Sequence, residues 1–272
     1  MHSWNKTSSP SLDELFNLDG KVALVTGAAG ILGSQIAAAL AEQGATIVAA
    51  SRNLENCQQL AKDFSAEYGG KHYALKLDIT DTDSVKACID GVIERSGKLD
   101  ILVNCSWTGA KNTWDTITEE DWLFDIDMCL NGVFRCVKAA YPHLKKTKGV
   151  ILNVASMYGH VAPDYRLYEG KETANPASYG AGKAGVIQFT KYLASFLSPH
   201  DIRANCISPG PFPYESLQRD DPRFAQRLAD KNTRKRVGKP YEMKGAAALL
   251  CSDASSYING QNICVDGGWA IW

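Results

Sequence analysis

The chain has 272 residues, of which 45% are hydrophobic, and these values suit one large globular domain with a well-buried core. Lysine and arginine total 29 against 30 for aspartate and glutamate, which gives a formal net charge of −1. This balance argues against a nucleic-acid-binding protein and against attachment to an anionic membrane surface, so neither is expected as a partner. A basic run at residues 231–236 is the local exception, and short runs of this kind are typical of solvated turns.

Cysteine usage and the N-terminal residues indicate the compartment. Eight cysteines are scattered through mostly apolar segments without a C-x-x-C pair, which is typical of buried, reduced thiols. The five histidines have no ligand spacing, so no metal site is predicted. Residues 1–10 are polar and lack the apolar segment of a signal peptide, and no window approaches the ~18 apolar residues of a membrane span. A cytoplasmic location is therefore expected.

After a polar lead-in, short segments rich in β-branched residues alternate with longer segments of helical spacing. Strands are predicted at residues 21–26, 45–50, 72–77, 101–103, 149–154, 202–207 and 261–265. Helices are predicted at residues 31–43, 54–68, 81–95, 119–144, 177–197 and 241–251. Continuous apolar strands that alternate with helices indicate a parallel sheet covered on both faces, and right-handed crossovers favour a doubly wound Rossmann sheet. We count seven strands and predict one α/β domain over residues 18–272, after an N-terminal extension over 1–17.

A glycine-rich turn lies between the first strand and the first helix, with the sequence Gly27-Ala-Ala-Gly30-Ile31-Leu32-Gly33. Glycine allows a positive φ in the turn and lets the backbone approach a pyrophosphate, while the start of the following helix offers free N–H groups. Because the turn directly follows strand one, we predict that Gly27, Gly30, Ile31, Leu32 and Gly33 bind a dinucleotide.

The end of the second strand is the place where a carboxylate would hydrogen-bond the ribose 2′-hydroxyl of NAD. This chain has Ser51 and Arg52 there instead, a hydroxyl and a cation that suit a 2′-phosphate. NADP is therefore favoured over NAD. An Arg52 that only faces solvent, beside a Ser51 that tolerates either cofactor, is the alternative.

Tyr179 and Lys183 are four residues apart at the start of the helix after strand five, so they share one helical face. A neighbouring ammonium favours the phenolate and lowers the pKa of a tyrosine. Such a tyrosine can exchange a proton with a substrate oxygen while hydride moves at the nicotinamide. Ser156, at the end of strand five, is placed to hold the same oxygen by a hydrogen bond.

With these motifs the sequence resembles the short-chain dehydrogenase/reductase family over about residues 18–269. Further segments similar to the family's signatures are Asp78-Ile79-Thr80, Ser208-Pro209-Gly210, residues 236–242 and residues 265–269. The resemblance implies that Tyr179 is the general acid/base, that Lys183 binds the nicotinamide ribose and that Ser156 orients the substrate. It also implies a homo-oligomer, a dimer or tetramer built on the long helices and the C-terminal strand. The further cofactor contacts that it implies are Asp78, Ile79, Asn104, Cys105, Pro209 and Gly210.

Two departures from the family pattern concern the active site. Cys129 stands where the family has a catalytic asparagine, and a thiol is a poor substitute for an amide in a water-mediated proton relay. The family's N-N-A-G after strand four is altered to Asn104-Cys105-Ser106-Trp107, which places Trp107 against the cofactor or over the active site. Slow or rerouted proton transfer is therefore expected.

Two long connections, 157–178 and 209–240, follow the carboxyl ends of strands, where open α/β sheets bind ligands. Within the first, residues 164–171 resemble loops of compact family members associated with sugar and glycan-precursor metabolism, and this piece is polar with two aromatic rings. We predict that Ser156, Tyr158, Arg166, Tyr179 and Phe212 contact a small polar substrate that is sugar-like or hydroxy-acid-like. A contact between subunits is the alternative role of this loop.

The leading hypothesis is an NAD(P)-dependent oxidoreductase that interconverts a secondary alcohol and a ketone. Two alternatives remain open. Cys129 and the altered strand-four motif favour a cofactor-binding protein with little catalysis. The G-x-x-G-x-x-G spacing of the glycine turn resembles that of nucleotide-sugar epimerases and dehydratases, although 272 residues leave no room for their additional substrate domain.

Overall fold

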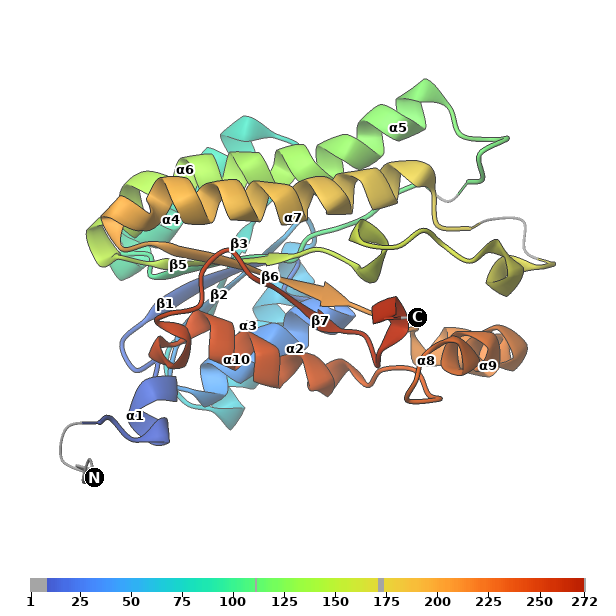
Figure 1. The fold of residues 1–272 in the computed structure, drawn as a ribbon. Coiled ribbons are helices and arrows are strands. Elements are labelled where there is room, and N and C mark those ends of the chain that lie inside the picture. The colour runs from blue at the N-terminus through green and yellow to red at the C-terminus, as the bar shows by residue number, and fades with distance from the viewer. Residues whose placement is uncertain (1–8, 111, 171–173, 272) are drawn as a thin grey trace.

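The computed structural model describes residues 9–110, 112–170 and 174–271, and these form one layered α/β domain (Figure 1). Seven parallel strands pair in the order β3-β2-β1-β4-β5-β6-β7. They are β1 Val22–Thr26, β2 Thr46–Ser51, β3 Tyr73–Lys76, β4 Ile101–Asn104, β5 Val150–Val154, β6 Arg203–Pro209 and β7 Asn262–Val265. The order runs outward in both directions from the β1–β4 pair, so the predicted doubly wound Rossmann sheet is confirmed.

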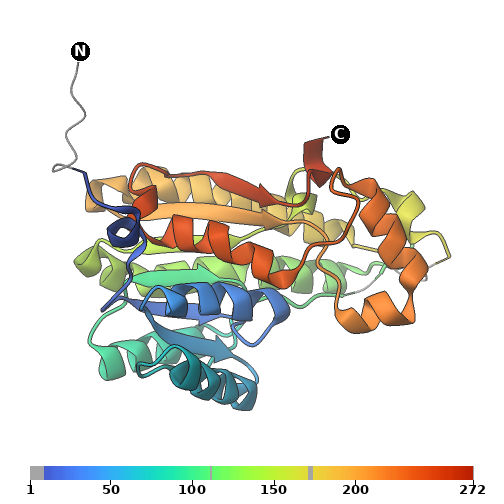
Figure 2. The same cartoon turned by 90° about the horizontal axis from the view of Figure 1, so that it is seen from below.

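Helices cover both faces of the sheet, as the views of Figures 1 and 2 show. They are α1 Leu12–Phe16, α2 Ile31–Glu42, α3 Leu54–Glu67, α4 Thr82–Ser96, α5 Glu119–Ile126, α6 Gly132–Thr147, α7 Ala177–Leu197, α8 Glu215–Asp220, α9 Pro222–Lys231 and α10 Lys244–Cys251. Successive side chains of β1 point to opposite faces of the sheet. Val22 and Leu24 pack in the core beneath α4, α6 and α7, whereas Ala23 and Val25 pack against α2 and α10.

The helix predicted over residues 119–144 is interrupted. α5 ends at Ile126, a π-helical turn follows at Asp127–Asn131, and α6 then continues to Thr147. The π turn packs tightly against α7, since a Cβ built on Gly182 would be 2.6 Å from the Cβ of Cys129. The extra residue in the turn therefore accompanies a tight helix crossing, and π turns of this kind are common at functional sites.

The two long connections carry secondary structure of their own. The first contains short 3-10 turns at Met157–Gly159 and Tyr165–Tyr168, and the second contains α8 and α9. Pro222 occupies the first turn of α9, where a missing N–H costs nothing, and the Asp221 side chain caps that helix. Pro222, which in the sequence predicts a loop, is therefore the start of a helix.

All eight cysteines are free thiols, as expected, and six of them are buried. Within the described ranges no helix is long and apolar enough to span a membrane. Leu18 is buried in the core beside α2, while residues 1–8 of the predicted extension lie outside the described part. The domain boundary at residue 18 stays a prediction.

Candidate active site

A cleft of about 510 Å³ opens at the carboxyl ends of β1, β2, β4, β5 and β6. This is the edge at which open parallel sheets bind ligands. The cleft gathers most of the predicted cofactor and catalytic residues on one surface. Its lining includes Gly27, Gly30, Ile31, Leu32, Gly33, Ser51, Cys105, Ser156, Tyr179, Lys183, Pro209, Gly210 and Phe212.

The glycine turn forms one end of this cleft. Gly27 has a φ of 66°, and a Cβ on Gly33 would lie 2.2 Å from the Gly27 carbonyl oxygen, so neither position has room for a side chain. Gly30 is the N-cap of α2 and offers no side chain to bond the N–H groups of the first turn. These free donors at a helix N-terminus fit an anionic pyrophosphate.

The adenosine side of the cleft begins where β2 ends. Ser51 lines it together with Asn53 and Asn56, which open α3, and Asn53 caps that helix through the Asn56 N–H at 3.0 Å. No carboxylate is among the described residues that line the cleft. Arg52 is exposed beside Ser51 rather than part of the lining.

Three residues that the family resemblance assigns to the cofactor lie outside the lining. The Asp78 carboxylate accepts hydrogen bonds from the backbone N–H and the hydroxyl of Thr80, at 3.0 and 2.7 Å. Ile79 is buried against Gly132 at the start of α6. Asn104 is buried at the end of β4, and its amide donates to the Asn153 side chain at 2.8 Å. In this structure the three side chains bond or pack within the fold and do not line the cleft.

Ser156, Tyr179 and Lys183 come together at the middle of the cleft. The Lys183 ammonium is buried, donates to the Val154 carbonyl at 2.8 Å and lies 5.8 Å from the centre of the Tyr179 ring. Burial raises the pKa of Tyr179, while the charge of Lys183 and a hydrogen bond with Ser156 oppose that rise. The expected lowering of the Tyr179 pKa by Lys183 is therefore present but smaller than the rise caused by burial.

Cys129 lies in the π turn between α5 and α6, where it contacts the helix α7 that carries Tyr179 and Lys183. Burial raises the pKa of its thiol, against smaller lowering effects from Lys183 and from a hydrogen bond with Trp107. The thiol is therefore neutral, and it fills the contact between the π turn and Gly182 of α7. Lys183 reaches its carbonyl partner without help from this side chain.

Trp107 forms a wall shared by the cofactor cleft and a second pocket. Its ring packs edge-on against Tyr179 with centroids 4.8 Å apart. The Thr26 hydroxyl accepts the N–H groups of Cys105 and Ser106, each at 3.1 Å, and so ties the start of this segment to β1. The expectation that Trp107 covers the active site agrees with this placement.

The second pocket, of about 500 Å³, continues from Tyr179 toward α8 and α9. Its walls are mostly aromatic and aliphatic, and no charged side chain is among the described residues that line it. Three polar side chains form a line of hydrogen bonds across one wall. The Asn175 amide donates to the Tyr168 hydroxyl at 2.9 Å, and that hydroxyl lies 3.1 Å from the Tyr158 hydroxyl. The lining includes Trp107, Ser156, Met157, Tyr158, Tyr168, Tyr179, Phe212, Tyr214, Leu217, Phe224 and Leu228.

The structure does not bring Arg166 to either pocket. Its side chain is 89% exposed and forms an ion pair with Asp164 at 2.7 Å. The inserted connection instead contributes Tyr168 and Asn175, which sequence reasoning did not select. The sequence signal was two aromatic residues, Tyr165 and Tyr168, in a polar loop. This signal indicates that the loop is near a ligand, but it does not show which of its side chains face the pocket and which face solvent.

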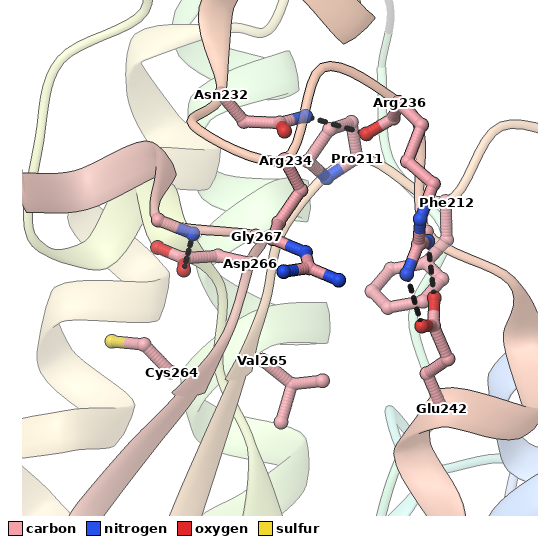
Figure 3. A pocket seen from close by; sticks show the side chains of 12 residues that line it. Pro211, Phe212, Asn232, Arg234, Arg236, Glu242, Cys264, Val265, Asp266 and Gly267 are labelled. Atoms are coloured by element: carbon pink, nitrogen blue, oxygen red, sulfur yellow. Dashed lines mark hydrogen bonds and ion pairs between the residues drawn. The ribbon is translucent and has the colours of Figure 1, made fainter.

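The two segments similar to C-terminal family signatures, residues 236–242 and 265–269, contribute to the lining of a third hollow, shown in Figure 3. Arg236 holds Glu242 through two hydrogen bonds of 2.7 and 2.5 Å and keeps the pKa of Glu242 at about 2. The buried Asn232 amide donates to the Arg236 carbonyl at 2.7 Å. A Cβ on Gly238 would lie 2.4 Å from the Phe212 ring. These signatures therefore brace the segment that places Phe212 against both pockets.

Comparison with known proteins agrees with this geometry. The family model described as enoyl-(acyl carrier protein) reductase matches residues 27–270. The chain belongs to the short-chain dehydrogenase/reductase family, and it is an NAD(P)-dependent oxidoreductase that acts on CH–OH groups.

Its relatives act on different alcohols and ketones. The D-threitol dehydrogenase of Mycolicibacterium smegmatis is 35% identical over 264 residues, which cover 96% of this chain and 97% of that protein. The 3-oxoacyl-(acyl-carrier-protein) reductase of Thermotoga maritima is 33% identical over 255 residues, or 93% and 99% of the two chains. A gluconate 5-dehydrogenase of Burkholderia cenocepacia, solved with NADP and tartrate, superposes with a TM-score of 0.86 at 32% identity over 96% of this chain and 100% of that one.

Proposed function

We propose that this enzyme uses NADP to interconvert a secondary alcohol and a ketone, with Tyr179 as the general acid/base. The observation that carries the proposal is the position of Ser156 and Tyr179, which line both the cofactor cleft and the second pocket. A carbonyl carbon between the two pockets would face the nicotinamide on one side, while its oxygen meets these hydroxyls. The Tyr179 variant described in the Discussion is the test of this role.

The side chains divide the chemistry among them. When bound, the nicotinamide cofactor supplies or accepts the hydride. Tyr179 donates its phenol proton to the carbonyl oxygen in reduction and, as the phenolate, takes a proton back in oxidation. Ser156 holds the same oxygen, and the Lys183 charge stabilises the phenolate that Tyr179 becomes. The N-terminus of α2 would hold the pyrophosphate, and the residues after β2 the adenosine ribose.

The end of β2 supports NADP as the preferred cofactor. Ser51 and the N-terminus of α3 line the cleft where the ribose would lie, and the exposed Arg52 follows Ser51 directly in the chain. A hydroxyl, a helix N-terminus and a nearby cation each favour a phosphate at the ribose 2′-position. The absence of a carboxylate among the described lining residues removes the group that would bind a free 2′-hydroxyl and repel a phosphate.

Arg52→Asp is expected to reverse this preference. A lost charge-assisted hydrogen bond of about 1.5–3 kcal/mol corresponds to a roughly 10- to 100-fold weaker NADPH affinity, with NADH affinity unchanged or improved. Fluorescence titration with each reduced cofactor measures both constants. Arg95→Asp, at the end of α4 and away from the cleft, is the matched charge control. Equal NADPH affinity in wild type and Arg52→Asp would contradict the assignment.

The second pocket supports a neutral, hydroxylated substrate within the polar class expected from the sequence. The Asn175–Tyr168–Tyr158 chain can exchange hydrogen bonds with substrate hydroxyls, and aromatic walls can pack against the C–H face of a polyol. The described lining offers no cation for the carboxylate of a hydroxy acid. We propose small polyols and their ketones, the type named for the D-threitol dehydrogenase relative, as the first compounds to assay.

A cofactor-binding protein with little catalysis is the second candidate, and Cys129 is the observation that favours it. Because Lys183 bonds the Val154 carbonyl directly, we expect Cys129→Asn to change turnover by less than about tenfold, which is about 1.4 kcal/mol in activation free energy. Steady-state kinetics on the first accepted substrate measures this. A much larger gain would mean that the native relay is impaired and would favour the second candidate.

We propose that the protein assembles into a homo-oligomer through α6 and α7. Tyr192 and Phe196 of α7 are more than half exposed and stack with ring centroids 5.8 Å apart. Phe134 of α6 is also half exposed and packs against Phe189. An exposed aromatic surface of this kind is typical of a subunit contact. The free, mostly buried thiols support the cytoplasm as the compartment.

A further inference from the structure

A buried carboxylate on α5 connects the two segments that meet over the active site. Asp125 has no exposed surface. One carboxylate oxygen accepts the Ser178 hydroxyl at 2.6 Å, and the other accepts the Ala110 backbone N–H at 2.9 Å. Within the described part of the chain, no lysine, arginine or histidine forms an ion pair with it. Burying a carboxylate without a cation is unfavourable, so these two bonds bear its stabilisation.

The partners of Asp125 are next to the active site on both sides. Ser178 directly precedes Tyr179 in the first turn of α7. Ala110 ends the segment 105–110, which we name the Trp107 segment, and it lines the second pocket. The segment fits tightly here, since a Cβ on Gly109 would lie 2.6 Å from the Trp107 ring and 2.7 Å from an Asp125 oxygen. The carboxylate therefore lies directly against the segment that carries Trp107.

We propose that Asp125 is a positioning residue that holds the Trp107 segment against the start of α7 and so fixes Tyr179 relative to Trp107. The two rings that its bonds bring together are the pair in edge-on contact at 4.8 Å. Just beyond the segment, Asn112 forms an isolated bridge with Ala174 of the connection after β5. The relative position of Tyr179 and Trp107 thus depends on Asp125, which contacts neither substrate nor cofactor.

The conservative variant separates position from charge. In Asp125→Asn, Oδ1 can still accept the Ala110 N–H, and the amide N–H can donate to the Ser178 hydroxyl, which turns from donor to acceptor. Asp125→Ala instead leaves the buried Ser178 hydroxyl and the partly buried Ala110 N–H without this partner. We expect kcat to fall about 100-fold in Asp125→Ala, the size of a 1 Å misplacement, and to stay within about threefold of wild type in Asp125→Asn.

Two further variants keep the test sharp. Ser178→Ala removes one bond and is expected to lower kcat about threefold to tenfold, with little further loss when combined with Asp125→Ala, because both act through one connection. Glu120→Ala, exposed on the same helix, is the control and should leave kcat unchanged. If Asp125→Ala does not fold, the comparison of Ser178→Ala with Asp125→Asn decides the question.

The kcat readout depends on the proposed function, so a second readout does not use turnover. Acrylamide quenching of Trp107, obtained by subtracting the Trp107→Phe spectrum, should increase in Asp125→Ala and match wild type in Asp125→Asn and Glu120→Ala. NADPH affinity should stay within about threefold of wild type in all of them, since the phosphate turn is not involved. A folded Asp125→Ala with wild-type kcat and quenching would overturn the proposal. A loss in Asp125→Asn equal to that in Asp125→Ala would also overturn it, by making charge the essential property.

Discussion

Replacing Tyr179 by phenylalanine is expected to abolish turnover while NADPH still binds. The variant keeps the ring that packs against Trp107 and the space beside Lys183, and it removes only the hydroxyl that exchanges the proton. General acid/base catalysis contributes about 10²–10⁴-fold to rate, so kcat should fall by about three orders of magnitude or below detection. Absorbance of NADPH during ketone reduction measures the rate, and fluorescence titration measures the affinity.

Tyr168→Phe is the matched control for this experiment. Tyr168 lines the same pocket, and its hydroxyl bonds only to Asn175 and Tyr158 within the described network. Its removal should raise KM for a hydroxylated substrate and leave kcat nearly unchanged, because the interaction is made equally in ground state and transition state. A Tyr179→Phe enzyme that retains wild-type kcat would contradict the assignment of the proton donor.

Gly33→Ala is expected to have the largest effect on cofactor binding. The added Cβ would lie 2.2 Å from the Gly27 carbonyl oxygen and 2.9 Å from its carbon, and backbone atoms cannot move aside as a flexible side chain would. Forcing extra volume into such a site costs about 1–3 kcal/mol of stability, and the displaced turn no longer presents the N–H groups of α2 to the pyrophosphate. NADPH titration and thermal unfolding, run together, should report both losses.

Gly245→Ala is the control for the helix effect of this substitution. Gly245 is exposed in α10, and nothing lies within 4 Å of a Cβ built there. The same change should leave NADPH affinity unaltered and stabilise the fold by up to about 1 kcal/mol, since alanine favours helix more than glycine. Unchanged NADPH affinity in Gly33→Ala would mean that this turn does not hold the cofactor.

Most of the fold could be predicted from the sequence because each strand is a continuous apolar run and each helix has its own spacing. The boundaries differ by a few residues where a polar residue or a proline ends an element, as at Ser51, which extends β2, and Ser208 and Pro209, which extend β6. The π turn at Asp127–Asn131 was not predictable. It depends on the close approach of Gly182, a residue some fifty positions away that a local pattern does not include.

The cofactor cleft was more predictable than the substrate pocket, for a physical reason. Phosphate binding needs glycine at fixed places in one local turn, so residues 27–33 signal it directly. The second pocket is built from connections that converge only in the folded chain, so Tyr168 and Phe224 meet although 56 positions separate them. Asp125 gave one usable signal, a carboxylate four residues before the buried Cys129 and so on the same helical face.

Titration of the purified wild-type protein with NADPH and NADH tests the central claim most directly. Trp107 lines the cofactor cleft, so energy transfer to a bound reduced nicotinamide should quench tryptophan emission and saturate. The account predicts saturable binding of both cofactors, with NADPH bound at least about tenfold more tightly, and loss of that signal in Gly33→Ala. The absence of saturable transfer with either cofactor at millimolar concentration would contradict the assignment of this cleft as the nicotinamide site.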